Sequence, residues 1–285
     1  MASTTKCLCF NKCRTYNGSL LDLSRRKPGP DRNGTYLKSS RHSRLRGNDG
    51  SSSDYLNFLV GHGWKFRGSG PGYEVRKENW KPFYEKLTKA REYLLQNKPI
   101  ASTDPRWYEV MLVIARAEGW GRNKFDELTS EAVAKYPNFY QLYFAALDYL
   151  VPKWHGNRKE VENFANFAVE HTQSLEDMGM YARVYWYASQ TQYGNGLFIE
   201  SSVVWKKMKT GIDDVLARYP DQWNINNFAR FACLAGDMDK AKELISRIQG
   251  DPIPKAWAGD VQHFATCKAW ATGSKQGVNL GRTVM

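Results

Sequence analysis

The sequence lacks the features that define membrane proteins, secreted proteins and most enzymes. No stretch approaches the roughly 18–20 apolar residues that are needed to cross a bilayer, so we expect no membrane span. The first residues contain no continuous apolar stretch, which argues against a secretory signal. Almost no segment has the alternating pattern of a β-strand. These absences predict a helical protein of the cytoplasm.

Signatures of catalysis and of metal binding are also missing. None of the five histidines has the spacing of a zinc-binding helix, and no Gly-x-Ser-x-Gly motif marks a nucleophilic serine. Gly68, Gly70 and Gly72 follow no strand and precede no Lys-Ser/Thr pair, so they do not predict a phosphate-binding loop. We therefore assign no catalytic residue, no metal and no cofactor.

Cysteine is scarce and unevenly placed, at Cys7, Cys9, Cys13, Cys233 and Cys267. An odd number without regular spacing argues against a disulfide scaffold and fits a reducing compartment. The first three lack the second half of a zinc motif. Cys233 and Cys267 fall within helical patterns, where we expect them to pack as small apolar groups.

Acidic residues occur as adjacent pairs, Glu176-Asp177 and Asp213-Asp214. Neighbours on a helix point about 100° apart, so such a pair does not converge on one substrate. We expect these residues on solvated helix faces and at helix starts.

Positive charge is concentrated at the beginning of the chain. The formal net charge is +12, and residues 1–50 hold four lysines and seven arginines against three aspartates, which leaves only +4 for the remaining 235 residues. Residues 24–54 are rich in Arg, Ser, Gly and Pro, which is typical of disorder. We predict a disordered basic tail over residues 1–53 and a flexible C-terminal tail over residues 274–285.

The run "HSRLRGNDG", residues 42–50, resembles the translation of a dispersed intergenic repeat of bacterial genomes. This resemblance implies that residues 1–53 are not native to the domain that follows. The alternative is a basic arm that binds the phosphates of a nucleic acid. Its contacts would be Arg25, Arg26, Lys27, Arg41, Arg44 and Arg46.

The rest of the chain has helical periodicity. We expect a short helix over Tyr55–Val60, a glycine-rich loop over residues 62–75 and a long helix from Lys77. In "STDPRWYEVMLVIARAEGWG", Asp104 is a good N-cap, and the glycines at the end close the helix.

A unit of two helices recurs along the sequence. "AVAKYPNFYQLYFAALDYL" and "VLARYPDQWNINNFARFACLAGD" share a helix that ends in Ala-Lys/Arg-Tyr-Pro and is followed by an aromatic-led helix. Aromatic starts at Trp107, Tyr140, Tyr181 and Trp223 are separated by 33, 41 and 42 residues, within the range of helix-pair repeats. In the last unit Gly236 permits a reversal, and Asp237 caps the next helix.

These patterns predict an all-α, tetratricopeptide-like α-solenoid of antiparallel helix hairpins over residues 54–273. "WYEVMLVIARAEGW", "YPNFYQLYFAALDYLVPKWHGN", "FACLAGDMDKA" and "GWKFRGSG" also resemble a tetratricopeptide-like bacterial domain of unknown function, number 4034, over about residues 54–250. The most specific part is the loop motif with Pro152, Trp154, His155 and Gly156, although the family pattern has Gly where His155 stands. The resemblance implies a fold and no activity.

The expected function is a non-catalytic scaffold that binds a protein or peptide on a concave helical face. Trp, Tyr, Asn and Arg on inner helices suit such contacts, because aromatic side chains anchor interfaces and Arg binds carboxylates. The candidate contacts are Arg183, Tyr185, Trp186, Asn226, Asn227 and Arg230. Two alternatives are nucleic-acid binding through the basic tail and a hydrolase with His155 as general base.

Overall fold

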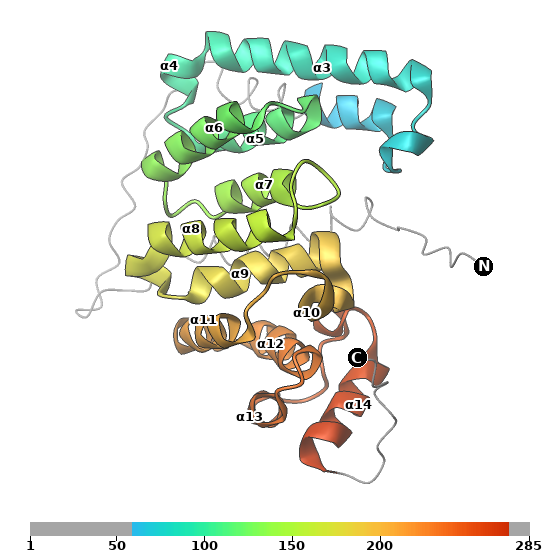
Figure 1. The fold of residues 1–285 in the computed structure, drawn as a ribbon, viewed down its shortest axis with the longest axis vertical. Coiled ribbons are helices and arrows are strands. Elements are labelled where there is room, and N and C mark those ends of the chain that lie inside the picture. Colours follow the sequence, from blue (N-terminus) through green and yellow to red (C-terminus); the bar gives the residue numbers. More distant parts are fainter. Residues whose placement is uncertain (1–58, 274–285) are drawn as a thin grey trace. The chain divides into compact units, whose positions relative to one another are not determined.

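The computed structural model describes residues 59–273, and every regular element in this range is a helix (Figure 1). The all-α prediction is therefore confirmed for these residues. None of the described helices is both long and apolar enough to cross a membrane. The tails predicted at 1–53 and 274–285 lie outside the described range. The chain divides into two units, residues 1–145 and residues 146–285, which are described in turn.

The first unit consists of helices around an aromatic core. Its elements are a helix over residues 59–67, the 3₁₀ turn η1 (Gly72–Glu74), α3 (Lys77–Gln96), α4 (Lys98–Ala101), α5 (Pro105–Glu118), α6 (Arg122–Lys135) and the first half of α7 (Gln141–Leu150). Helix α5 packs against both α3 and α6. The expected N-cap is confirmed, because Asp104 accepts a hydrogen bond from the backbone N–H of Arg106 at 2.9 Å.

The loop expected over residues 62–75 begins later than the sequence suggested. The preceding helix continues to residue 67, and only residues after it are irregular. The ring of Trp64 packs on Phe83 of α3 at a centroid distance of 5.1 Å, and Leu59 is buried. Packing against α3 thus keeps this segment helical, although its glycines alone indicate a loop.

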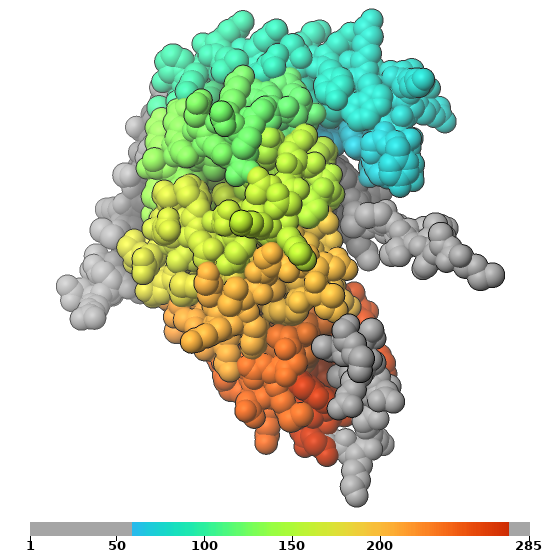
Figure 2. Space-filling view, in the orientation of Figure 1, coloured from blue at the N-terminus to red at the C-terminus, as the bar shows by residue number. Residues whose placement is uncertain are grey.

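The second unit begins within α7 and continues as helices joined by short turns. Its elements are α8 (Arg158–Glu176), α9 (Gly179–Ala188), the π-helical turn η2 (Ser189–Tyr193), the 3₁₀ turn η3 (Gly194–Gly196), α10 (Leu197–Glu200), α11 (Trp205–Arg218), α12 (Gln222–Leu234), α13 (Met238–Ser246), the 3₁₀ turn η4 (Pro254–Trp257) and α14 (Val261–Thr272). Helix α9 packs on α8 and α11, and α12 packs on α13. In the space-filling view the atoms of α8 to α13 form a surface without gaps between neighbouring helices (Figure 2).

Helices α9 and α11 approach closely at a glycine. A Cβ on Gly211 would lie 2.4 Å from the carbonyl oxygen of Met178 and 3.2 Å from the Cβ of Ala182. Only a residue without a side chain fits at this distance. The contact fixes how α11 lies against the start of α9.

The turn between α12 and α13 forms as the sequence predicts. Gly236 has φ +72°, in the left-handed region that favours glycine. Asp237 caps α13 by accepting from the backbone N–H of Lys240 at 3.0 Å. Its other carboxylate oxygen accepts from the indole N–H of Trp205 at 2.9 Å and from Lys209 at 2.8 Å. One carboxylate therefore ties α11 to this turn.

The two helical cysteines are not separate apolar groups, as the sequence suggested. Cys233 of α12 and Cys267 of α14 form a disulfide, with their Cα atoms 6.0 Å apart. The Cα separation is normal for such a bond. Spacing alone did not reveal the pair, because 34 residues separate the two positions.

Substituting Gly211→Ala should destabilise the second unit. Alanine favours helix by about 1 kcal/mol relative to glycine, but its Cβ would collide with the backbone of Met178, and overpacking costs about 1–3 kcal/mol. Urea denaturation should therefore show a net loss of stability. Gly61→Ala is the matched control, because Gly61 also lies within a helix and nothing lies within 4 Å of its Cβ position. A Gly211→Ala variant as stable as this control would contradict the close approach.

Asp237→Asn should flatten the acid side of the pH–stability profile. Burial alone would raise the pKa of Asp237, but hydrogen bonds from Lys209, the Lys240 backbone and Trp205 outweigh it and lower the pKa to about 2. An unfolded aspartate has a pKa of about 3.9, so this carboxylate stabilises the fold above about pH 4 and ceases to do so as the pH falls towards 2.

Asparagine still caps a helix but does not titrate, so the variant should lose less stability than the native chain between pH 4 and 2. Chemical denaturation across this range measures the difference. Parallel profiles for the two proteins would show that Asp237 does not carry the effect.

Candidate functional site

The six residues that the sequence selects for partner binding lie in the interior of the second unit. Arg183, Tyr185 and Trp186 belong to α9, and the other three to α12; every one of the six is at most 5% exposed. The structure therefore buries the six residues that we expected on an accessible face. Their contacts show what each side chain does instead.

Tyr185 belongs to a cluster around the carboxylate of Glu162 on α8. The carboxylate accepts from the hydroxyls of Tyr185 at 2.6 Å and Tyr181 at 2.7 Å, and from the ammonium of Lys207 at 3.1 Å. Burial raises the pKa of Glu162, but these hydrogen bonds outweigh it, so the pKa lies below its usual value. The Tyr185 hydroxyl thus links α9 to α8.

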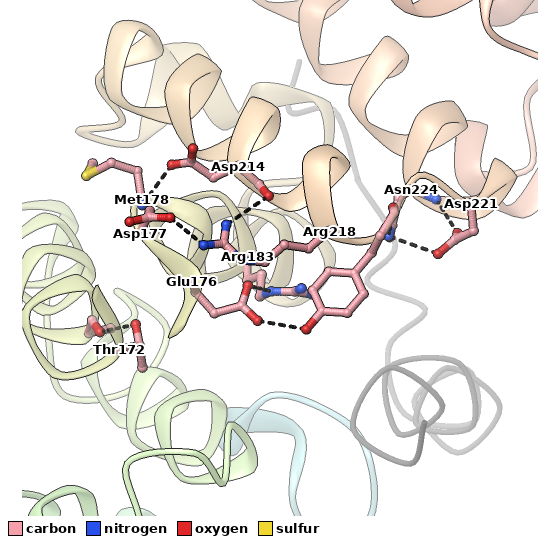
Figure 3. A network of polar contacts seen from close by, with 11 residues as sticks. Thr172, Glu176, Asp177, Met178, Arg183, Asp214, Arg218, Asp221 and Asn224 are labelled. Carbon is pink, nitrogen blue, oxygen red and sulfur yellow. Dashed lines mark hydrogen bonds and ion pairs between the residues drawn. The ribbon is translucent and has the colours of Figure 1, made fainter. Parts of the chain in front are cut away.

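Arg183 forms a buried ion pair with Glu176 at the end of α8. Its Nε donates to the Glu176 carboxylate at 3.1 Å, and both side chains are at most 4% exposed (Figure 3). The Tyr219 hydroxyl donates to the other carboxylate oxygen at 3.4 Å, and the guanidinium lies 5.2 Å from the Tyr219 ring centroid. Glu176, expected on a solvated face, is a buried charge instead.

Around this pair, α11 fastens the turn between α8 and α9. Asp214 accepts from the backbone N–H of Met178 at 2.9 Å, and Arg218 forms an ion pair with Asp177 (Figure 3). Asp177 has φ +48°, in the left-handed region that side chains rarely adopt. Two acidic residues expected to be merely solvated therefore hold a strained turn in place.

On α12, three residues spaced at helical intervals share one face of the helix: Asn226, Arg230 and Cys233, which we call the α12 stripe. Asn226 accepts at its Oδ1 from the backbone N–H of Ile253 and from the indole N–H of Trp257, both at 3.1 Å. Arg230 donates to the Asn195 side chain. Cys233 is bonded to Cys267.

The positive charge of Arg230 affects the pKa of His263 on α14. Burial and then the charge of Arg230 lower the pKa of His263, while Asp260 opposes them. Later residues contact the stripe at two of its three positions, Trp257 at Asn226 and Cys267 at Cys233. We call residues 253–272 the strap.

The remaining two candidates on these helices are also internal. The Trp186 ring packs on Phe228 and Trp223 of α12 at centroid distances of 5.4 and 6.3 Å. Asn227 donates to the carbonyl of Trp223 within its own helix at 2.8 Å. The buried indole N–H of Trp186 has no hydrogen-bond partner among residues 59–273.

The loop motif connects α7 to α8. The backbone N–H of His155 donates to the Tyr149 carbonyl at 3.0 Å, and the two rings pack in a tilted arrangement with their centroids 4.6 Å apart. A Cβ on Gly156 would lie 2.0 Å from the Leu150 carbonyl oxygen, so glycine is required there. Pro152 and His155 are exposed, and Trp154 is half-buried. The motif builds a tight loop that returns the chain over the end of α7.

The structure contains no group of three potential metal ligands among its described residues. The Cys7, Cys9 and Cys13 cluster lies outside them. No family model matches the chain, and no curated protein or solved structure matches it either. The resemblance to domain 4034 accordingly stays a prediction.

Sequence reasoning missed Glu162, Glu176 and Trp257. Glu162 lies on α8 and its partners on α9 and α11, so no local spacing reveals the cluster. Trp257 stands in a short 3₁₀ turn outside any amphipathic pattern. For Glu176 the sequence did contain a signal, because its partner Arg183 follows seven residues later. The chain reversal between α8 and α9 separates the two residues, so helical spacing does not reveal the pair.

Glu176→Gln should destabilise the second unit strongly. The substitution removes the carboxylate charge that faces Arg183, and breaking a buried pair from one side costs about 3–5 kcal/mol. Asp126→Asn breaks the exposed pair between Arg122 and Asp126 and should change stability by less than about 1 kcal/mol. Urea denaturation of both variants compares them. Equal, small losses would mean that the Glu176–Arg183 pair does not stabilise the fold.

Proposed function

We propose that the protein is a non-catalytic scaffold, built from tetratricopeptide-like helix pairs, that binds a segment of a partner protein in the cytoplasm. The observation that carries this proposal is the α12 stripe. Its residue types are those of interfaces, and its cover is a strap of the same chain. A binding face occupied by an internal segment accounts for both facts.

The packing of the second unit supports this proposal. Residues with binding chemistry on α9, such as Tyr185 and Arg183, are tied into clusters with α8, α11 and the residue after α11. On α12 the strap is bonded to Asn226 and Cys233, whereas Arg230 donates to Asn195 of η3. The contacts of Asn226 are therefore the ones that another polypeptide segment can replace.

The hydrolase alternative has less support. The known contacts of His155 are a backbone hydrogen bond and tilted packing on the rings of Tyr149 and Trp154. These contacts shape a loop and supply no activation of a nucleophile. Nucleic-acid binding rests on the +8 charge of residues 1–50, which lie outside the described residues.

Affinity capture with two baits tests the proposed function. The full chain and a fragment starting at Ser53 are exposed to native-cell lysate under reducing conditions, and every captured protein is then tested with purified components. A scaffold should retain the same partner on both baits, with a defined stoichiometry.

Retention of nucleic acid by the full chain alone, lost steeply as salt is raised, would move the binding function to residues 1–52. Failure of every captured protein to bind the purified fragment would contradict the scaffold proposal.

A further inference from the structure

Few side chains pack α14 against its neighbours. Of its twelve residues only Cys267 and Ala271 are buried, and both side chains are small. They lie four residues apart and therefore share one face of the helix. The larger side chains of Phe264 and Trp270 remain half-buried. Because the free energy of apolar burial scales with the area removed from water, this packing holds α14 less firmly than α12, in which nine of thirteen residues are buried.

The beginning of the strap is held by non-covalent contacts with α12. The Oδ1 of Asn226 accepts from the backbone N–H of Ile253 and from the indole N–H of Trp257. Trp257 is also fully buried. Hydrogen bonds and burial together therefore fasten η4 to α12.

A sharp turn separates η4 from α14. Ala258 has φ +58° and Gly259 has φ +81°, both in the left-handed region that side chains rarely adopt. Asp260 then begins α14 as its N-cap and accepts from the backbone N–H groups of Gln262 and His263. Since α14 has its own cap and follows this turn, it is a separate segment that needs its own fastening.

The two halves of α14 are fastened by different forces. In the first half, the rings of Phe264 and His263 pack edge-to-face on Trp257 at centroid distances of 5.0 and 5.7 Å. In the second half, Cys267 is bonded to Cys233 of α12, 34 positions earlier. A bond between residues so far apart stabilises the folded state by restricting the unfolded chain. The second half of α14 therefore depends on a bond that a reductant can break.

The length of α14 makes this dependence stronger. Helix α14 packs chiefly on α13 and to a smaller extent on α12. Isolated helices shorter than about 12–15 residues are only marginally stable in water. A helix of twelve residues that leaves these neighbours is therefore expected to unravel.

We propose that the Cys233–Cys267 bond is a redox latch: while closed it holds α14 folded on α13 and α12, and its reduction releases α14, which then unfolds, while η4 stays bound to Asn226. In a reducing compartment disulfides are usually transient or redox-sensing, which suits a bond of this kind. The inference concerns the end of the second unit and does not depend on the scaffold function.

A dithiol reductant supplies the electrons for this step. One of its thiolates attacks the sulfur of Cys233, which is half-buried, and the buried Cys267 leaves as a thiolate that takes up a proton. The second thiol of the reductant then attacks its own sulfur in the mixed disulfide and displaces Cys233 as a thiolate, which also takes up a proton. The reductant ends as a cyclic disulfide, and the protein gains two electrons and two protons as two thiols.

Limited trypsin digestion of the full chain tests the proposal. Lys268 is exposed on α14, and trypsin cleaves after it only when the helix opens, so the cleavage rate follows the population of the open helix. Lys206, exposed on α11, is the reference site in the same chain. One sample is reduced with dithiothreitol, both samples are treated with iodoacetamide, and all reagents are removed before trypsin is added.

Mass spectrometry then follows cleavage at the two sites. We expect cleavage after Lys268 to be about tenfold faster in the reduced chain, because α14 then spends more time open. The rate after Lys206 should not change, since α11 packs on α9 and the latch does not hold it.

Two variants separate the causes. The full chain with Cys233→Ser and Cys267→Ser should be cleaved rapidly after Lys268 without any reductant, which excludes an effect of the blocking reagent. The full chain with Cys7→Ser, Cys9→Ser and Cys13→Ser should keep the whole response to reduction, which excludes an effect of these three cysteines.

Three outcomes would overturn the latch. Equal cleavage after Lys268 in both samples would show that non-covalent packing is sufficient to hold α14. Equal acceleration after Lys206 and Lys268 would show that the bond stabilises the whole second unit and does not act on α14 alone. Loss of the response in the variant without the first three cysteines would assign the effect to them.

Discussion

Burial of polar side chains on α9 and α12 is the constraint on which the second unit depends. A buried polar group must find a hydrogen-bond partner, because an unmade hydrogen bond costs more than a made one contributes. Glu162 and Glu176 on α8 satisfy Tyr185 and Arg183 of α9, and the strap satisfies Asn226 of α12. The two helices therefore differ in how these polar residues are held: Tyr185 and Arg183 of α9 by α8, and Asn226 of α12 by the strap.

This difference explains the structural role of the Cys233–Cys267 disulfide. Without the strap, the Oδ1 of Asn226 would lose both of its donors, Ile253 and Trp257. The Cys233–Cys267 bond fastens α14, the last helix of the strap, to α12.

Local features of the fold could be predicted from the sequence. Asp104 and Asp237 are N-caps because their chemistry acts on amides two or three residues away, and Gly236 is a turn for reasons of backbone sterics alone. The all-helical class follows from periodicity. The site could not be predicted in the same way. The hydrophobic periodicity of a helix does not show which other segments pack on it when both of its faces are buried.

The errors arose where partners lie far apart in sequence. Arg230 and Asn226 have the residue types of an open binding face, and nothing near them in sequence shows that residues 253–272 cover it. Glu176 was placed in solvent because its partner Tyr219 stands 43 positions later. The predicted helix ended too early because the glycines of residues 59–67 indicate a loop. In the structure Trp64 packs on Phe83 of α3, and this contact keeps the segment helical. In each case a tertiary contact outweighed a local preference.

Amide hydrogen exchange of α14 in the full chain tests the central claim most directly. Exchange is followed by mass spectrometry on the oxidised chain and on the chain reduced with dithiothreitol. We expect the amides of residues 261–272 to exchange markedly faster after reduction, while those of α8 and α9 remain equally protected. Unchanged protection of α14 in the reduced chain would contradict the account, since the Cys233–Cys267 bond would then not be what holds α14 in place.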